Sequence, residues 1–313
     1  MATPVIEIRG LSKVYDNRRV VDNLNLTLYE GEVFGLLGPN GAGKSTTILM
    51  LLGLSEPSTG SVTIAGIDAT RNPVEVKRIV GYLPEDVGFY DHMTALENIV
   101  YTAMLNGLTR SEAEYKAMAL LKRVGLADEA HKKIGKYSRG MRQRLGLADV
   151  LIKNPRVIIL DEPTLGIDPS GMREFLELIV QLSREEKITV LFSSHHLHQV
   201  QQVCDRVAIF VAGKLIAEGN IEDLSKKLFE NGNFHIEFAV SETLSVETVE
   251  KVLSNIKGIK RIEPQADIFA IESEHDVTAE IGKVLVEQGY NLRHLTRKQY
   301  GLDEIYQRYF LNA

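Results

Sequence analysis

The sequence contains a single cysteine, Cys204, among its 313 residues. A lone thiol excludes an intrachain disulfide framework and favours a reducing compartment. No apolar run reaches the roughly 18 residues that a membrane-spanning helix needs. Residues 1–10 have too few basic and apolar side chains for a signal peptide. These absences argue against a disulfide-stapled secreted protein and against a membrane-spanning one.

An excess of basic residues is also missing. Lys and Arg total 36 and Asp and Glu total 42, which gives a formal net charge of −6. This balance excludes a protein whose main work is to coat nucleic acid, and we expect no nucleic-acid partner. We find no internal repeat, low-complexity linker or sustained heptad pattern. The remaining composition, 44% hydrophobic and 25% charged, is typical of a globular protein. The length predicts about two domains.

The first 220 residues alternate strand-like and helix-like stretches, which predicts an α/β layer structure. Alternating apolar and polar residues at 5–11 and 20–29 predict antiparallel strands with one solvated face. Helical periodicity begins near Lys44, and Thr94 with Glu97 forms a capping box at the start of a mostly helical stretch. Other predicted strands lie at 33–37, 61–65, 157–160, 188–192 and 206–211, and other helices at 94–124, 170–182 and 197–203.

The pattern changes after Leu224. Strands and helices then follow in the order β-α-β-β-α-β, which predicts a small α+β ferredoxin-like domain over residues 225–313. We expect the two central strands to meet at a turn containing Pro264, and a final helix over residues 302–311 to carry Tyr306. The predicted strands are 234–240, 259–263, 268–272 and 292–296, and the predicted helices are 246–256 and 277–288.

Residues 38–45 read GPNGAGKS and fit the pattern G-x-x-x-x-G-K-[ST]. A buried strand precedes this segment and a helix follows it, so a chance glycine-rich turn is the weaker interpretation. Glycines let the backbone wrap phosphate groups, and Lys44 neutralises the β- and γ-phosphates while the Ser45 hydroxyl holds Mg²⁺. The residues predicted to bind nucleotide here are Gly38, Pro39, Asn40, Gly41, Ala42, Gly43, Lys44, Ser45 and Thr46.

Two carboxylates, Asp161 and Glu162, end the buried strand at 157–160. The carboxyl ends of such strands are where α/β sheets bind ligands. We predict that Asp161 orients Mg²⁺ through water and that Glu162 is the general base for an attacking water. Without the phosphate loop (residues 38–45), the same pair would equally suit the start of an ordinary loop.

With these motifs in place, residues 5–219 resemble the ATP-binding subunits of ABC transporters. Residues 137–143, YSRGMRQ, stand where that family carries its LSGGQ signature, and Ser138 and Gly140 match it. The resemblance implies a P-loop NTPase core with a mixed sheet and a helical subdomain at about residues 91–135. It also implies a homodimer in which Ser138 and Gly140 of one copy face the ATP of the other. Arg139 departs from the pattern and is expected either beside the phosphate or in solvent.

Four further residues take roles from this resemblance. Tyr15 matches the aromatic platform for adenine, with strand packing as the alternative. Glu85, in GYLPE, stands where the family's Q-loop has glutamine, and is expected to contact Mg²⁺ or its water and to take part in catalysis. Asp168 ends a segment like the D-loop, which contacts the partner subunit. His195 matches the switch histidine that holds the γ-phosphate.

The signature segment (residues 137–143), the GYLPE segment and the C-terminal extension together resemble the exporter branch that serves separate ABC-2-type permeases. The resemblance implies ATP-driven export, a peripheral position on the cytoplasmic face of the membrane, and ATP with Mg²⁺ as ligands. Residues 88–90 are expected either to line the groove for the permease or to pack against helices. A copper-maturation transporter is a weaker resemblance. The C-terminal domain is expected to be regulatory or dimer-stabilising.

Three alternatives remain open from the residues. His195, His196, His198 and Cys204 lie close in sequence and are suitable ligands for Zn²⁺ or copper. A soluble regulatory ABC-type ATPase, as in translation or DNA repair, would share the core, although such proteins usually carry two cores or a long coiled coil. The C-terminal domain could sense a small molecule or a metal. A P-loop kinase is disfavoured because the signature and switch-histidine segments have no role there.

Overall fold

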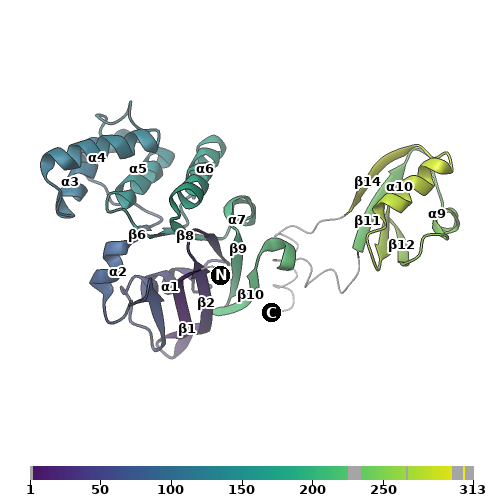
Figure 1. The fold of residues 1–313 in the computed structure, drawn as a ribbon, viewed down its shortest axis with the longest axis horizontal. Helices are drawn as coiled ribbons and strands as arrows, with labels where there is room; N and C mark the ends of the chain where they lie inside the picture. Colours follow the sequence, from purple (N-terminus) through teal and green to yellow (C-terminus); the bar gives the residue numbers. More distant parts are fainter. Residues whose placement is uncertain (1–2, 225–233, 266, 298–305, 307–313) are drawn as a thin grey trace. The chain divides into compact units, whose positions relative to one another are not determined.

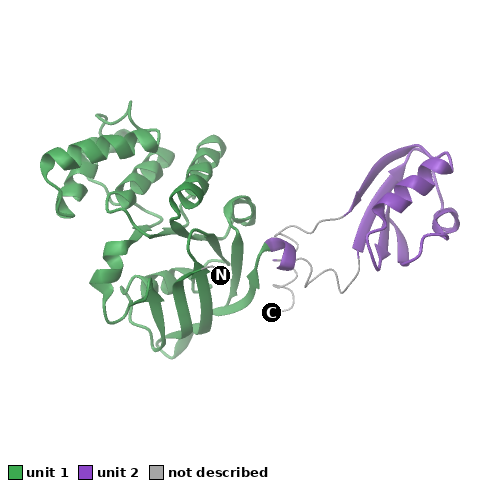
Figure 2. Ribbon diagram, in the orientation of Figure 1, with its two compact units in different colours: residues 1–220, 313 green, residues 221–312 purple. Residues whose placement is uncertain are grey.

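The computed structural model describes residues 3–224, 234–265, 267–297 and 306. They form two compact units, which divide between Asn220 and Ile221 (Figures 1 and 2). The boundary expected from the sequence, after Leu224, lies slightly further along the chain. Most of the expected final helix falls outside the described residues.

An antiparallel sheet in unit 1 has the strand order β2-β1-β4-β5. The antiparallel pairing of its first two strands, with Ile8 opposite Leu26, was expected from their alternating pattern. The strands are β1 (Pro4–Tyr15), β2 (Arg18–Tyr29), β4 (Thr59–Ile64) and β5 (Ile67–Asp68).

The central sheet of unit 1 has the order β10-β9-β3-β8-β7-β6. All its strands are parallel except β10, which pairs antiparallel with β9. Every residue of β3, β7 and β8 is buried, as apolar strands covered on both faces should be. The strands are β3 (Val33–Leu37), β6 (Val80–Leu83), β7 (Val157–Asp161), β8 (Thr189–Ser194), β9 (Arg206–Val211) and β10 (Lys214–Gly219).

One apolar cluster joins the two sheets of unit 1. Ile48 of α1 packs together with Ile64 of the antiparallel sheet and with Phe34 and Ile159 of the central sheet. Burial of each such side chain is worth about 1.5–3 kcal/mol, so the cluster fixes α1 and the loop before it. The helices that flank the central sheet are α1 (Lys44–Leu51), α2 (Pro73–Ile79), α6 (Pro169–Glu186) and α7 (Leu197–Val203).

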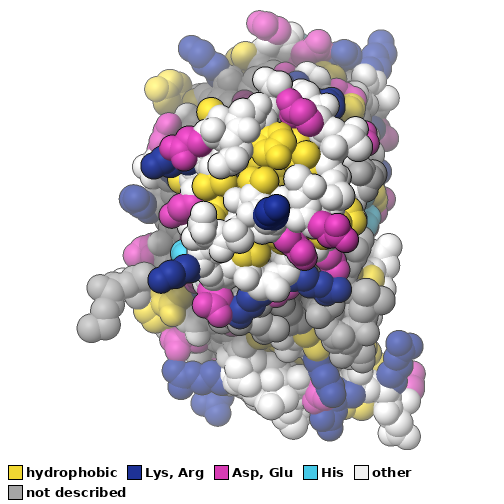
Figure 3. Space-filling model, turned by 90° about the vertical axis from the view of Figure 1, so that its right-hand side faces the viewer, with side chains coloured by type: hydrophobic (Ala, Val, Ile, Leu, Met, Phe, Trp, Pro, Cys, Tyr) yellow, Lys and Arg dark blue, Asp and Glu magenta, His cyan; other side chains and the backbone are white. Residues whose placement is uncertain are grey.

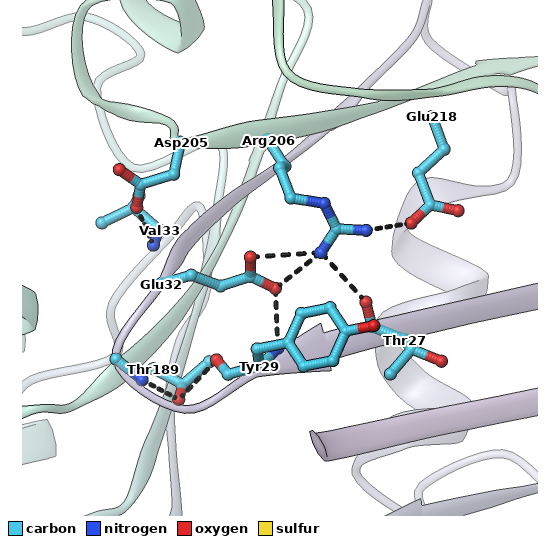
Figure 4. Close-up of polar contacts among 9 residues, drawn as sticks. Thr27, Tyr29, Glu32, Val33, Thr189, Asp205, Arg206 and Glu218 are labelled. Carbon is cyan, nitrogen blue, oxygen red and sulfur yellow. Dashed lines mark hydrogen bonds and ion pairs between the residues drawn. The ribbon is translucent and has the colours of Figure 1, made fainter. Parts of the chain in front are cut away.

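A polar network around Arg206 also ties the two sheets together (Figure 4). Both carboxylate oxygens of Glu32 lie 3.1 Å from Arg206 Nη1, and Glu218 accepts from Nη2. Nη1 also donates to the carbonyl of Thr27 in β2, at 3.3 Å. Burial raises the pKa of Glu32, and the guanidinium opposes that shift. The network therefore anchors the start of β3, which leads into the phosphate loop.

The segment between β6 and β7 forms a group of helices (Figure 1). The expected capping box is confirmed, because Thr94 Oγ1 accepts from Glu97 N and Glu97 accepts from Thr94 N. The stretch at 94–124 is mostly helical, as expected, and consists of two helices separated near Gly107, whose φ is +91°. The elements are α3 (Ala95–Leu105), α4 (Arg110–Arg123), a 3₁₀ turn (Ile134–Lys136) and α5 (Arg139–Leu151).

Unit 2 has the element order β-α-β-β-α-β and the sheet order β12-β13-β11-β14. This confirms the ferredoxin-like arrangement, with a core that includes Ile236, Phe238 and Ile281. Its elements are β11 (Phe234–Val240), α9 (Val246–Leu253), β12 (Ile259–Gln265), β13 (Ile268–Ser273), α10 (Thr278–Glu287) and β14 (Leu292–Arg297). On the face shown in Figure 3, hydrophobic side chains gather among acidic and basic ones.

The expected turn at Pro264 is wrong. Pro264 lies inside β12 and pairs with Phe269 of β13. β12 is an edge strand of its sheet, so the backbone N–H that proline lacks is not needed for a hydrogen bond between inner strands. The hairpin therefore extends beyond the point where the proline suggested it would turn.

Candidate nucleotide site

Four neighbouring parallel strands end at one edge of the central sheet. Leu37 of β3 pairs with Ser194 of β8, and Asp161 of β7 pairs with Ser193 of β8. β6 runs parallel to β7 and ends directly before the Q-loop residues Pro84 and Glu85. The phosphate loop, the two carboxylates, the predicted switch histidine and the predicted Q-loop therefore lie together at the carboxyl ends of these strands, where α/β sheets bind ligands.

The phosphate loop takes a backbone path that only glycine allows at two positions. A Cβ on Gly38 would lie 2.5 Å from Phe210 O, and one on Gly43 would lie 2.6 Å from Val20 O. Gly43 also has a φ of +105° directly before α1 begins at Lys44. The loop thus wraps closely around the N-terminus of α1, where backbone N–H groups favour anions.

Lys44 is buried, and its ammonium group contacts both the loop and a carboxylate. Nζ donates to Gly38 O at 2.7 Å and to Pro39 O at 3.3 Å. It also lies 3.5 Å from Glu162 Oε1. The lysine is therefore held at the phosphate loop by backbone and carboxylate oxygens.

Asp161 is buried at the end of β7, and its Oδ1 atom has no hydrogen-bond partner among the described residues. Burial raises the pKa of Asp161, while the polar side chains of Ser193 and Ser45 lower it. Burial and the Asp161 carboxylate also raise the pKa of Tyr82 to about 12. Asp161 Oδ1, Glu162 Oε1 and Ser193 Oγ are thus buried at this site without a hydrogen-bond partner in the described residues, and the role of Asp161 and Ser45 toward Mg²⁺ stays a prediction.

Glu162 lies between two basic side chains. Its Oε2 is 2.9 Å from His195 Nδ1 and its Oε1 is 3.5 Å from Lys44 Nζ. The residue has a φ of +48°, which is uncommon for a side chain other than glycine and costs of order 1–3 kcal/mol. Its N–H donates to Ser193 O at 3.0 Å, so the neighbouring strand supports this conformation. The carboxylate predicted as base and the predicted switch histidine are therefore in direct contact.

The signature segment lies at the start of α5. Ser138 is the N-cap, and its Oγ accepts from Met141 N at 3.3 Å. Arg139 is partly exposed: Nη2 is 3.4 Å from Glu85 O and Nη1 is 3.6 Å from Asp86 Oδ1. The buried Gln143 also donates to Glu85 O, at 2.9 Å. The signature helix therefore holds the Q-loop backbone of the same chain.

Four predicted residues lie apart from this cluster. Ser138, Gly140 and Tyr15 make no hydrogen bond with the phosphate loop within the described part of the chain. Tyr15 is 45% exposed; its hydroxyl lies 3.1 Å from Ser55 Oγ, and Lys13 Nζ lies 4.8 Å from its ring centre. Asp168 caps α6 by accepting from Gly171 N, and this hydrogen bond lowers the pKa of Asp168. Their roles toward nucleotide or partner stay predictions.

The alternative metal site draws no support from the geometry. Across the described ranges, no three His, Cys, Asp or Glu side chains are arranged to hold a metal ion. A Cβ on Gly35 would lie 3.0 Å from Cys204 Sγ, so this thiol packs against β3. His195 and His196 stack on each other with ring centres 4.0 Å apart.

Sequence reasoning missed three residues that support the site. Ser193 lies beside Asp161, and its position in the SSH segment was the available indication. Thr164 and Gln199 are both buried and hydrogen-bonded to each other, although they are far apart in sequence. No sequence pattern connects these two residues, because only the packing of α7 brings them together.

Comparison with known proteins identifies the family. Residues 21–165 match the ABC transporter family. The chain is 35% identical to the bacitracin transport ATP-binding protein BcrA of Bacillus licheniformis, over 96% of each chain. It is 33% identical to the linearmycin resistance ATP-binding protein LnrL of Bacillus subtilis, over 96% of this chain and 97% of the relative.

Solved structures agree with the sequence relatives. The chain resembles the dimeric post-hydrolysis state of the ATP-binding cassette MJ0796 with ADP and Pi, at a TM-score of 0.63 and 25% identity. That similarity covers 69% of this chain and 98% of the cassette. The protein belongs to the ATP-binding subunits of ABC transporters.

This membership confirms the expected family, the P-loop NTPase fold and the ATPase activity. The protein is an ATP-binding and ATP-hydrolysing subunit of an ABC transporter. Subunits of this class work with membrane permeases and form dimers. No helix in the described part of the chain is long and apolar enough to span a membrane.

Proposed function

We propose that this chain is the ATPase of an exporter, working as a homodimer under a separate ABC-2-type permease on the cytoplasmic face of the cell membrane. The observation that carries its catalytic part is the Glu162 carboxylate held between Lys44 and His195 beside the phosphate loop. A base, a cation and a phosphate-sensing imidazole are thereby gathered where the γ-phosphate of ATP would lie.

Mg²⁺ is the proposed metal partner of ATP, and the donor set fits it. Ser45 and Asp161 supply hard oxygen ligands, and the buried Asp161 Oδ1 atom lacks a hydrogen-bond partner. Glu85 follows β6 at the same end of the sheet and adds a third donor, the second carboxylate of the set. A bound Mg²⁺ would neutralise developing charge on the phosphates.

The protein's own residues would then carry the hydrolysis. Glu162 accepts a proton from the attacking water, which needs a carboxylate in its ionised form. His195 orients Glu162 through Nδ1, at 2.9 Å, and its remaining ring nitrogen is available for the γ-phosphate. Lys44 exchanges backbone oxygens for phosphate oxygens when ATP binds.

The dimer is proposed to close head to tail around two ATP molecules. Ser138 and Gly140 start α5, whose N-terminus favours an anion, yet neither contacts its own phosphate loop in the described chain. A dimeric solved cassette, MJ0796, shares 26% identity with this chain at a TM-score of 0.63. These observations support a phosphate of the opposite copy as the partner of this segment.

Export rests on the resemblance to the exporter branch and on the names of relatives. Those names refer to bacitracin transport and linearmycin resistance, so an antibiotic is the cargo class that we propose. Exposed Tyr90 and Tyr101 pack edge to face on the helical group and form part of the proposed permease-facing surface. We propose that residues 1–224 form the ATPase domain. Residues 225–313 form a regulatory or dimer-stabilising domain.

A cysteine cross-link tests the permease contact. In a Cys204→Ser background, Tyr90→Cys should cross-link to an integral membrane protein in vesicles from the native host, because Tyr90 is exposed. The matched control, Tyr115→Cys, is exposed on α4, outside the proposed surface. Mass spectrometry should identify the product as a multi-span permease. Cross-linking only to non-membrane proteins would contradict the proposed coupling.

Glu85 is expected to tolerate glutamine but not alanine. Glu85→Gln keeps an oxygen for Mg²⁺ or its water, so ATP hydrolysis should stay near the wild-type rate. Glu85→Ala removes that oxygen and should lower kcat by roughly tenfold. Steady-state phosphate release measures both, with Glu177→Ala on the exposed side of α6 as the control. Equal rates for Glu85→Ala and wild type would remove Glu85 from the site.

A further inference from the structure

Gln199 is a buried amide that contacts two other segments. It lies in α7, four residues after His195, and is 9% exposed. Its Oε1 accepts from the hydroxyl of Thr164, which is 3% exposed. Its Nε2 lies 3.0 Å from Met172 Sδ in the first turn of α6. A single side chain thus connects the helix after the switch histidine to the strand end that carries Glu162 and to α6.

These two contacts lie on either side of the D-loop (residues 165–168). Thr164 directly precedes the D-loop, and Met172 follows it. The backbone of Thr164 also accepts from Ile167 N at 3.2 Å, and Met172 N donates to Asp168 O at 2.9 Å. Gln199 therefore holds both ends of the D-loop from α7.

The same two segments are joined a second time at the catalytic pair. Glu162 contacts His195 at 2.9 Å, and Thr164 contacts Gln199. The His195 side chain is 31% exposed, so its contact can be exchanged for a ligand, whereas the Thr164–Gln199 contact is shielded from water. A hydrogen bond shielded from water is stronger than an exposed one, and a buried amide that loses its partner destabilises the fold. The segments that carry Thr164 and Gln199 are therefore expected to move together.

We propose that Gln199 is a positioning residue for ATP hydrolysis. Through Thr164 and Met172 it fixes the D-loop relative to the Glu162–His195 pair, so that a shift of the D-loop at the dimer interface changes the alignment of base and histidine. The inference rests on the proposed roles of Glu162 and His195. It assigns a function to two buried residues, Thr164 and Gln199, that need not touch ATP themselves.

The test removes the contact in two ways in the full-length chain. Gln199→Leu removes the amide, and Thr164→Val removes the hydroxyl at nearly constant volume. Each should lower kcat about tenfold or more, because small misplacements of catalytic groups cost up to 10²-fold, while KM for MgATP stays unchanged. Thr164→Ser keeps the hydroxyl and should retain the wild-type kcat.

The double variant Thr164→Val with Gln199→Leu separates positioning from stability. It leaves neither polar partner unpaired, so its thermal midpoint should recover relative to the single variants. Its kcat should stay low, measured well below the midpoint on protein whose fold is verified by circular dichroism. Gln202→Leu, exposed on the same helix, is the matched control and should behave as wild type.

Wild-type kcat in folded Gln199→Leu and in the double variant would overturn the inference. Glu162→Gln in the same assay identifies the other failure. If that variant hydrolyses ATP normally, the proposed catalytic roles are wrong. If it is inactive while Gln199→Leu turns over normally, only the positioning role is wrong.

Discussion

Replacing Glu162 by Gln is expected to stop steady-state ATP hydrolysis while leaving ATP binding intact. The amide keeps the shape of the side chain and one of the two oxygens that face Lys44 and His195, but it cannot accept a proton from water. Loss of a general base typically lowers kcat by about 10²- to 10⁴-fold. Phosphate release should fall by this factor, and fluorescent-nucleotide binding should stay near the wild-type affinity.

The same variant should accumulate as an ATP-bound dimer, because closure no longer ends in hydrolysis. Size-exclusion chromatography with light scattering should show this dimer with ATP and the monomer with ADP. Glu177→Gln, a matched change on the exposed side of α6, should hydrolyse ATP as the wild type does. Normal turnover by Glu162→Gln would exclude Glu162 as the base.

Replacing Lys44 by Met should abolish nucleotide binding at micromolar concentrations. The buried ammonium group is the cation that contacts the phosphate loop in the described structure, at 2.7 Å from Gly38 O. A hydrogen bond to a charged group contributes about 1.5–3 kcal/mol, which corresponds to roughly a 10- to 150-fold change in Kd. Isothermal titration with MgATP should therefore show at least this loss.

A stability measurement separates lost binding from lost folding. Saturating ATP stabilises a binding-competent chain, so it should raise the thermal midpoint of the wild type but not that of Lys44→Met. Lys122→Met, an exposed change on α4, should keep the full ATP-induced shift. An undiminished ATP-induced shift in Lys44→Met would show that the phosphates are bound elsewhere.

Features that are local in the sequence were predicted well. The capping box at Thr94 depends on residues three apart, and the phosphate loop depends on glycines within one short segment. The ferredoxin-like order followed from short strands and helices with clear periodicity. In each case the residues that produce the feature lie within a short stretch of the chain, so the local sequence pattern is sufficient to predict it.

Features that depend on a neighbour in space were missed or misread. Pro264 continues a strand because β12 lies at a sheet edge, which no local pattern reveals. Arg139 contacts the backbone at Glu85, a contact within the chain that its place in the signature segment did not predict. Thr164 and Gln199 meet only because α7 packs against α6 and the segment that follows β7.

The sequence by itself determined the family, the ATPase chemistry and the identity of the phosphate loop, since each rests on residue types at fixed short spacing. Tertiary structure decided which of these groups touch. Parallel strands β3, β8, β7 and β6 bring distant segments to one edge, where Glu162 meets His195 and Lys44. Burial at that edge then sets the properties of the groups: it raises the pKa of Asp161 and leaves an oxygen unpaired. The pKa shift and the unpaired oxygen both arise because water is excluded from these groups, and water is excluded only when the chain is packed.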